Sequence, residues 1–246
     1  MVMEIDCKGM YYKKLNKMIR DAIDKNETEF ILHNINGQRY IGNGINKKIK
    51  ITINGVPGND LAMFMNGPSL IVNANGQDGL ANTMNAGEII VYGSAGDVLG
   101  YGMRGGKLLI RDNVGYRTGI HMKEYKKQVP VIIAGGVAGD FCGEYMAGGV
   151  LVLLGLDKDE DTPIAGDYLG TGMHGGVIYI RGEVEEHTLG KEVSVLELND
   201  KDIKLLKKHL GEYCKHFGLD LEEVMSKPFI KLLPVSSRPY GNLYAY

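Results

Sequence analysis

A repeated motif runs through the middle of the sequence and constrains its fold more than any other feature. The clearest copy, GDVLGYGMRGG at residues 96–106, is followed by an apolar run. Its methionine recurs along the chain at intervals of 19, 19, 19, 24 and 27 residues. A period of this kind is typical of proteins built from stacked structural repeats. The methionines are Met65, Met84, Met103, Met122, Met146 and Met173.

Other positions recur relative to the methionine. The residue four places before it is usually leucine, with Thr118 and Cys142 as exceptions. The residue three places before it is always small: Ala62, Ala81, Gly100, Gly119, Gly143 and Gly170. The residue six places before it is acidic or Asn except at Tyr116: Asn59, Asp78, Asp97, Asp140 and Asp167. We interpret leucine and methionine as interior residues, the small residue as a corner, and Asp/Asn as acceptors for nearby backbone N–H groups.

The repeats occupy residues 58–182 without a helical segment between them. Parallel strands are usually joined by helical crossovers, which these short units leave no room for. A unit of about 19 residues cannot bury its own apolar face, so it must stack on its neighbours. The sequence therefore predicts a mainly β protein, a single-stranded parallel β-helix. The two long intervals contain charged insertions at residues 123–128 and 157–163, which we expect to loop outward.

The segments on either side of the repeats have a different character. Apolar residues at helical spacing predict a helix over residues 11–25, and strands are expected at 29–34 and 48–53. A second helix should begin after the N-cap Asn199 and end at Gly218, with a short helix at 219–225. We divide the chain into an N-terminal helix with lead-in strands (1–57), the repeats (58–184) and a C-terminal helical cap and tail (185–246). The helices are expected to cover both ends of the solenoid.

Composition excludes several classes of partner. The formal net charge is -2, so no overall positive field favours nucleic acid or an anionic membrane. No apolar run reaches the ~20 residues of a membrane span, and the N-terminus lacks the features of a signal peptide. The cysteines, Cys7, Cys142 and Cys214, share no spacing typical of disulfides or metal sites. We therefore expect a cytoplasmic protein.

Two glycine motifs, at residues 100–105 and 170–175, match the G-x-G-x-x-G pattern of dinucleotide sites. That pattern requires a helix after the glycines, whereas here a strand follows each match. The glycine before the methionine is replaced by Phe64, Thr83, His121 or Tyr145 in sister copies. We therefore interpret both matches as structural corners.

The remaining candidates for chemistry also favour structural roles. Cys142 occupies the register of interior leucines, and Cys214 lies with His209 and His216 at a spacing that does not close a metal site. The Asp/Asn series could hold Ca²⁺, but its period does not match the known acidic repeats. The arginines that could form an anion patch are Arg104, Arg111, Arg117 and Arg181. We predict no catalytic, cofactor-binding or metal-binding residue in this chain.

Residues 96–106, 139–149 and 166–176 resemble the GXGXG repeats at the C-terminal end of the large subunit of glutamate synthase. This resemblance covers about half of the chain and implies a right-handed β-helix. Related repeats occur in one of the subunits of formylmethanofuran dehydrogenase. The chain lacks an N-terminal cysteine, the length of a (β/α)₈ barrel and clustered cysteines. It is therefore similar to a stand-alone GXGXG subunit of a split enzyme.

The resemblance implies a non-catalytic structural subunit of glutamate synthase, which forms glutamate from glutamine and 2-oxoglutarate. The expected partners are a glutaminase subunit and an FMN-containing synthase subunit, with FMN and iron-sulfur clusters held by those partners and no cofactor bound by this chain. Two alternatives remain: the β-helix subunit of a formylmethanofuran dehydrogenase complex, and an autonomous ligand-binding solenoid.

Overall fold

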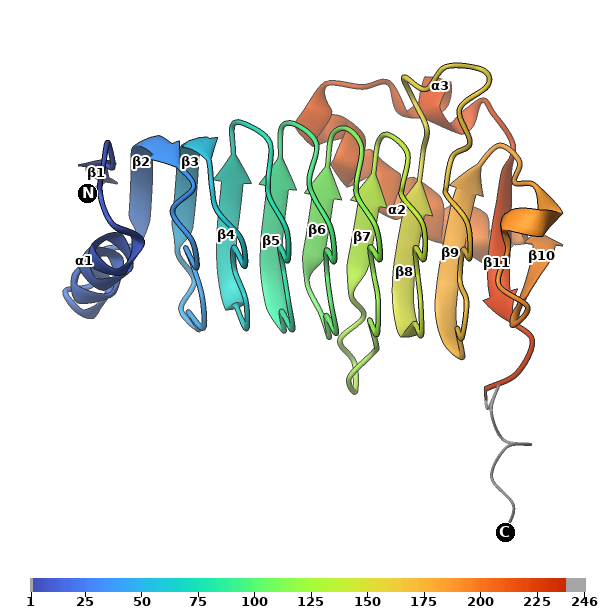
Figure 1. Ribbon diagram of the computed structural model, residues 1–246, viewed down its shortest axis with the longest axis horizontal. Coiled ribbons are helices and arrows are strands. Elements are labelled where there is room, and N and C mark those ends of the chain that lie inside the picture. The colour runs from blue at the N-terminus through green and yellow to red at the C-terminus, as the bar shows by residue number, and fades with distance from the viewer. Residues whose placement is uncertain (1, 238–246) are drawn as a thin grey trace, which may run out of the picture.

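A computed structural model describes residues 2–237 of the chain. It shows a rod of stacked coils, each of which adds one strand to a single long sheet (Figure 1). Strands β1 to β9 follow one another in sequence order and pair in parallel. The predicted parallel β-solenoid is thus confirmed. These strands are β1 (Val2–Asp6), β2 (Glu29–Asn36), β3 (Lys50–Val56), β4 (Asn66–Val72), β5 (Ala86–Val91), β6 (Lys107–Ile110), β7 (Val131–Ala134), β8 (Ala147–Leu153) and β9 (Gly175–Arg181).

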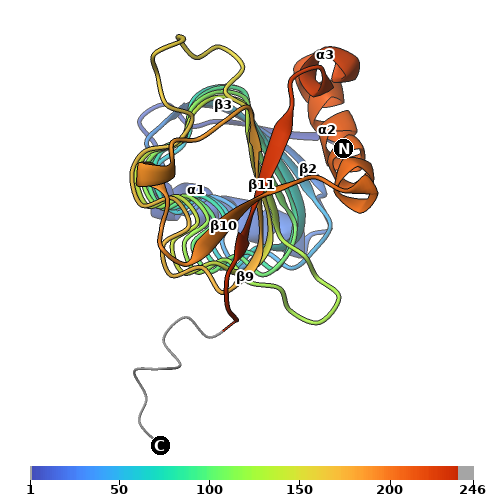
Figure 2. The ribbon, with the colours of Figure 1, turned by 90° about the vertical axis from the view of Figure 1, so that its right-hand side faces the viewer.

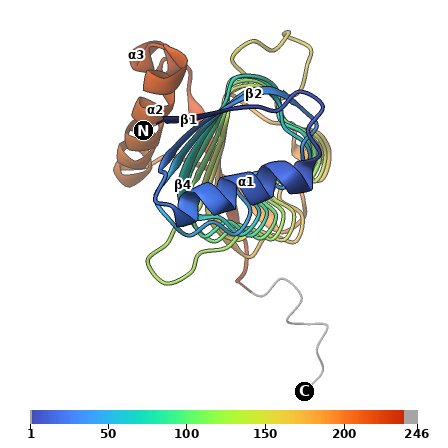
Figure 3. The same ribbon diagram turned by 90° about the vertical axis from the view of Figure 1, so that its left-hand side faces the viewer.

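The rod ends differently at its two termini. Helix α1 (Tyr12–Asp24) crosses the N-terminal end of the coil stack, and its apolar residues Leu15 and Ile19 are buried in the main core (Figure 3). At the other end, β11 (Phe229–Pro234) and β10 (Val193–Glu197) add to β9 in antiparallel fashion, with a 3₁₀ turn at Glu186–Thr188. The N-terminal end is therefore capped by a helix as expected.

The C-terminal helix takes a different position from the end cap that we predicted. Helix α2 (Asp200–Phe217) and the short α3 (Leu221–Met225) lie along the outer face of the sheet (Figures 1 and 2). The cause is a second apolar surface. Leu109 and Ile133 point away from the interior and pack in one cluster with Leu206 of α2. A helix on this flank buries the apolar side chains that the sheet turns outward, which favours this position.

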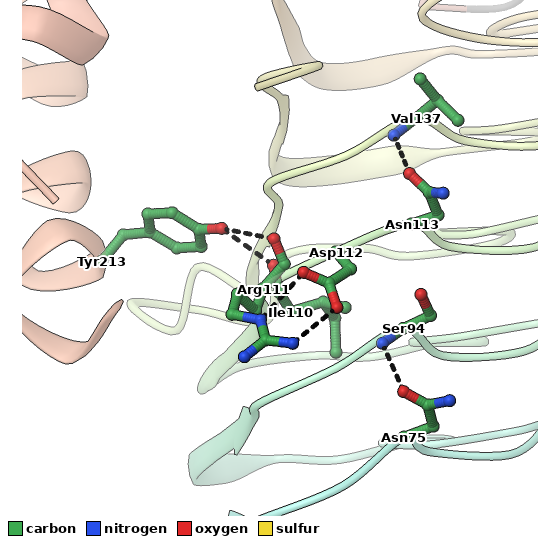
Figure 4. Close-up of polar contacts among 8 residues, drawn as sticks. All are labelled: Asn75, Ser94, Ile110, Arg111, Asp112, Asn113, Val137 and Tyr213. Carbon is green, nitrogen blue, oxygen red and sulfur yellow. Dashed lines mark hydrogen bonds and ion pairs between the residues drawn. The ribbon is translucent and has the colours of Figure 1, made fainter. Parts of the chain in front are cut away.

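Polar contacts fix α2 on the sheet. The Tyr213 hydroxyl donates to the carbonyl oxygens of Ile110 and Arg111, at 3.0 and 3.2 Å, just where β6 ends (Figure 4). At the helix N-terminus, Asp202 accepts from the Tyr179 hydroxyl at 2.7 Å and from Lys231 at 2.5 Å. Burial acts to raise the pKa of Asp202, but its hydrogen bonds and Lys231 lower it overall. The helix therefore remains in a fixed register against β6, β9 and β11.

Tyr213→Phe tests the first anchor. We expect a loss of about 1 kcal/mol in the free energy of unfolding, because one hydroxyl donor is removed while the ring remains packed. Equilibrium chemical denaturation of the two proteins measures this difference. Tyr92→Phe should cost a similar amount, because the Tyr92 hydroxyl also donates to α2, at the His216 carbonyl, at 2.9 Å. An unchanged free energy of unfolding in Tyr213→Phe would contradict the anchor.

The repeats extend beyond the range predicted for them. Ile45 takes the place of the methionine in an earlier copy, Tyr40-Ile41-Gly42-Asn43-Gly44, and its carbonyl accepts from the N–H of Asn66 as the methionine carbonyls do from the next coil. A partial copy ends at Val193. The sheet crosses residue 57 without a break, because β2, β3 and β4 pair in sequence. The charged insertions form the two loops that project from the stack (Figure 1).

Candidate functional site

The corner that precedes each methionine has an unusual backbone. In the copy at Met103, the residues five, three and one places before it are Val98, Gly100 and Gly102, with φ of +60°, +63° and +56°. The same three positions have positive φ in the other five copies. Only glycine adopts this conformation without strain, and for a β-branched residue such as Val98 it is a rare state. Contacts between coils must therefore stabilise the corner.

Hydrogen bonds that alternate in direction supply this stabilisation. The Val98 and Gly102 N–H groups donate forward to Tyr116 and Ile120 of the next coil, at 2.8 and 2.9 Å. The Gly100 N–H donates backward, to Leu80 of the preceding coil, at 2.8 Å. The other predicted copies repeat this alternation, apart from the last one. The GXGXG pattern thus encodes a corner whose alternate residues have left-handed backbone and donate hydrogen bonds to the next coil and to the preceding coil in turn.

The residue three places before the methionine is small for a reason that we did not predict. A Cβ at Gly100 would lie 2.5 Å from Cδ1 of Ile132, and one at Gly143 would lie 2.6 Å from Cδ1 of Ile178. The position therefore faces a strand side chain inside the coil. The left-handed positions on either side hold side chains such as Phe141 and Tyr145, which are both partly exposed. The residue one place before the methionine therefore varies among the copies, whereas the residue three places before it is always small.

The methionines fill the interior and contact the next coil. All six predicted positions are fully buried. Their methyl groups occupy the space of a missing side chain: a Cβ at Gly106 would lie 2.5 Å from Cε of Met84, and one at Gly176 would lie 2.6 Å from Cε of Met146. The glycines three places after Met84, Met103, Met146 and Met173 are thus partners of the methionine one coil earlier.

The Asp/Asn series forms hydrogen bonds between coils. Asp78 accepts from the N–H of Asp97, and Asp97 accepts from that of Tyr116, both at 2.9 Å. Asp140 accepts from Asp167 at 3.0 Å. A parallel series uses Asn75 and Asn113, which accept from Ser94 and Val137 (Figure 4). The expected acceptor role is present, but the donor belongs to the next coil. Within residues 2–237, no three His, Cys, Asp or Glu side chains converge as a metal site.

Aromatic and charged side chains gather outside the left-handed corner and contact one another. His121 stacks on Tyr145 with ring centroids 5.2 Å apart. Tyr101 makes a T-shaped contact with the His121 ring, with centroids 5.7 Å apart. Phe141 stacks on Tyr168 at 4.9 Å, and the Arg117 guanidinium lies 4.7 Å above the Phe141 ring. We name this the corner surface; it consists of Tyr101, Tyr116, Arg117, His121, Phe141, Glu144, Tyr145 and Tyr168. Sequence analysis missed it, although its members share the positions around the small residue.

The corner surface is ordered and partly exposed. Arg117 donates to Glu144 at 2.9 Å. This ion pair links the stacked pair of Phe141 and Tyr168 to the stacked pair of His121 and Tyr145. Tyr101, Tyr116 and Tyr168 keep 40%, 51% and 55% of their surface exposed. Aromatic residues and arginine are enriched at the energetic centres of protein interfaces. Because stacking already restricts these side chains, little conformational entropy remains to be lost when a partner docks.

The cysteines have the properties of structural residues. All three are buried and free. Burial raises the pKa of the Cys142 thiol to about 12 and that of Cys7 to about 11. Thiolate, the reactive form, is scarce under these conditions. The four predicted arginines do not form one patch. Arg111 pairs with Asp112, Arg117 pairs with Glu144, and Arg181 donates to the Val224 carbonyl. The Nε atom of Arg104 is buried and has no hydrogen-bond partner within the described residues.

These features define a class of protein, a parallel β-solenoid with a left-handed corner in every repeat. Residues 13–235 match the GXGXG motif family, and the chain belongs to that family. It is also 46% identical over 248 residues to a protein of Methanocaldococcus jannaschii named Uncharacterized protein MJ1350, with 98% of this chain and 95% of the relative covered. In the described part of the chain, no helix is long and apolar enough to cross a membrane.

Proposed function

We propose that the chain is a non-catalytic scaffold subunit of a multi-subunit glutamate synthase. The observation that carries this proposal is the corner surface, an ordered array of exposed aromatic side chains on a rigid stack. Membership of the GXGXG motif family supports it, because the C-terminal domain of glutamate synthase carries similar repeats. The proposed partners are a glutaminase subunit and an FMN-containing synthase subunit, which would hold the FMN and iron-sulfur clusters. The proposed location is the cytoplasm.

The fold suits such a role physically. Each coil is bonded to its neighbours through the sheet, the alternating corner bonds and the Asp/Asn series, so the rod resists bending. A rigid element holds two docked subunits at a fixed separation, which transfer of ammonia between active sites requires. Little of the subunits' binding free energy is then lost in ordering the scaffold.

Affinity capture from native lysate tests the proposal. We expect the tagged full-length chain to recover a glutamine amidotransferase and a flavoprotein. Tyr101→Ala combined with Tyr168→Ala should reduce recovery of at least one of them about tenfold or more, since exposed aromatic anchors each contribute ~1–2 kcal/mol. Tyr125→Ala is the matched control, because Tyr125 is equally exposed, at 49%, but lies on the first insertion loop.

Three outcomes would contradict the proposal in different ways. Recovery of formylmethanofuran dehydrogenase subunits would replace the enzyme named here by the alternative. Recovery that is unchanged in the double variant would remove the corner surface as the interface. Glutamine-dependent glutamate formation by the purified chain alone would contradict the non-catalytic role.

A further inference from the structure

A groove lies away from the corner surface, where the first insertion loop and helix α2 interrupt the regular repeat. The first insertion loop and helix α2 both project on the outer side of the sheet (Figure 3). Between them and the beginnings of β5 and β6 lies a groove of about 480 Å³. We name it the α2 groove; the lining residues used below are Lys107, Lys127, Val129, Leu205, Lys208 and His209. Its volume falls within the range of small-molecule sites, roughly 300–1,000 Å³.

The charge of the groove has one sign. Lys107, Lys127 and Lys208 line it, and none of its lining residues is Asp or Glu. Lys107 is neutralised by an ion pair with Glu212 of α2. Lys127 and Lys208 come from different elements, and neither has an ion-pair partner among residues 2–237. An anion between them would be attracted by both ammonium groups.

His209 supplies an independent observation. It is only 8% exposed, and its Nδ1 atom has no hydrogen-bond partner within the described residues. A buried polar atom without a partner is unfavourable, by about 1–3 kcal/mol. Burial lowers the pKa of His209, and Lys208 and Lys107 lower it further while Glu212 opposes them. An anion bound nearby would oppose the two lysines, raise the pKa of His209 and favour its protonated form.

The remaining wall is apolar. Val129 of the insertion loop is 43% exposed, and Val131 and Leu205 lie beside it in the groove. The loop is held in place because the Gln128 side chain donates to the Asn85 carbonyl at 2.9 Å. An inorganic ion alone would leave this wall exposed to water, whereas a ligand with an apolar body would cover it.

We propose that the α2 groove binds a small organic anion, a carboxylate or phosphate with an apolar body. Lys127 from the insertion loop and Lys208 from α2 attract the charged group, the His209 ring lies against it, and Val129 and Leu205 contact the apolar part. This site is separate from the corner surface and does not depend on the proposed scaffold role.

Titration of the full-length chain with benzoate, phenyl phosphate, inorganic phosphate and benzyl alcohol tests the site. The histidine ring signals are followed by NMR. We expect saturable shifts of the His209 signal with benzoate or phenyl phosphate, and the stronger of the two identifies the charged group. Benzyl alcohol and inorganic phosphate should bind at least about tenfold more weakly, because each lacks one half of the recognised chemistry.

Variants separate the site from general charge effects. Lys208→Ala and Lys127→Ala should each weaken binding about threefold or more, since one cation is lost in each. Lys204→Ala, an exposed lysine on the same helix outside the groove, should leave it unchanged. Thermal melting checks that the variants fold. The inference is overturned if neither organic anion shifts His209, if benzyl alcohol binds equally well, or if Lys204→Ala has the same effect as Lys208→Ala.

Discussion

Met103→Asp is expected to lower the free energy of unfolding by about 4 kcal/mol or more, among the largest effects of any single substitution in this chain. Met103 is fully buried and packs in the interior cluster with Met84 and Leu108. This cluster consists of apolar side chains, so within the described residues it offers no cation to pair with a carboxylate. The new side chain must therefore be buried unpaired, become protonated, or force the coil open. Urea denaturation, or the thermal midpoint if unfolding is irreversible, measures the loss.

Two matched substitutions separate charge burial from other effects. Met103→Leu keeps an apolar side chain of similar volume and should cost less than about 1.5 kcal/mol. Tyr101→Asp introduces the same carboxylate two residues away, at a side chain that is 40% exposed, and should cost about 1 kcal/mol. If Met103→Asp were no worse than Tyr101→Asp, the methionine could not face the interior.

The solenoid could be predicted because its determinants are local and repeated. One coil of 19 residues contains the leucine, the small residue and the methionine, and its sister copies serve as an internal alignment. The copy at Ile45 escaped detection because isoleucine replaces the methionine that defined the register. Gly42 and Gly44, at the correct offsets, were the signal that could have found it.

The position of α2 could not be predicted from its own amphipathic pattern, which shows only that one face is buried. The informative signal lay in the strands. The strand at 48–53 alternates apolar and polar residues, whereas 108–110 and 131–133 are continuously apolar. A strand without alternation is covered on both faces. This comparison, applied coil by coil, would have placed α2 over the outer face of β4 to β9.

The corner surface and the α2 groove depend on contacts between distant residues. Lys127 and Lys208 are brought together only because the insertion loop and α2 project on the same side of the sheet. Stacking of His121 on Tyr145 depends on the left-handed backbone, which directs these side chains outward. No spacing in the sequence encodes either arrangement before the register of the coils is known.

Gly96→Ala is the second substitution with a large expected effect, of about 2–3 kcal/mol, because it overpacks a fixed contact between coils. A Cβ at this position would lie 2.1 Å from Oδ1 of Asp78, one coil earlier. That oxygen cannot move away without losing the hydrogen bond from the N–H of Asp97, at 2.9 Å. Gly96 does not have positive φ, so alanine meets no backbone strain there. Gly211→Ala, whose added Cβ would meet only ordinary contact at 3.9 Å, is the control and should be neutral or stabilising.

A double-mutant cycle shows whether Gly96 and Asp78 form one unit. Asp78→Ala alone should cost about 1–2 kcal/mol, because the Asp97 N–H loses its acceptor. Asp78→Ala also removes the oxygen that a side chain at residue 96 would clash with. The loss in the double variant should therefore be smaller than the sum of the two single losses by about 1 kcal/mol or more. The free energies of unfolding of the four proteins measure this coupling. If the two losses simply add, the glycine is required for a reason other than the Asp78 side chain. The Asp series would then stabilise the coil stack without explaining why glycine occupies these positions.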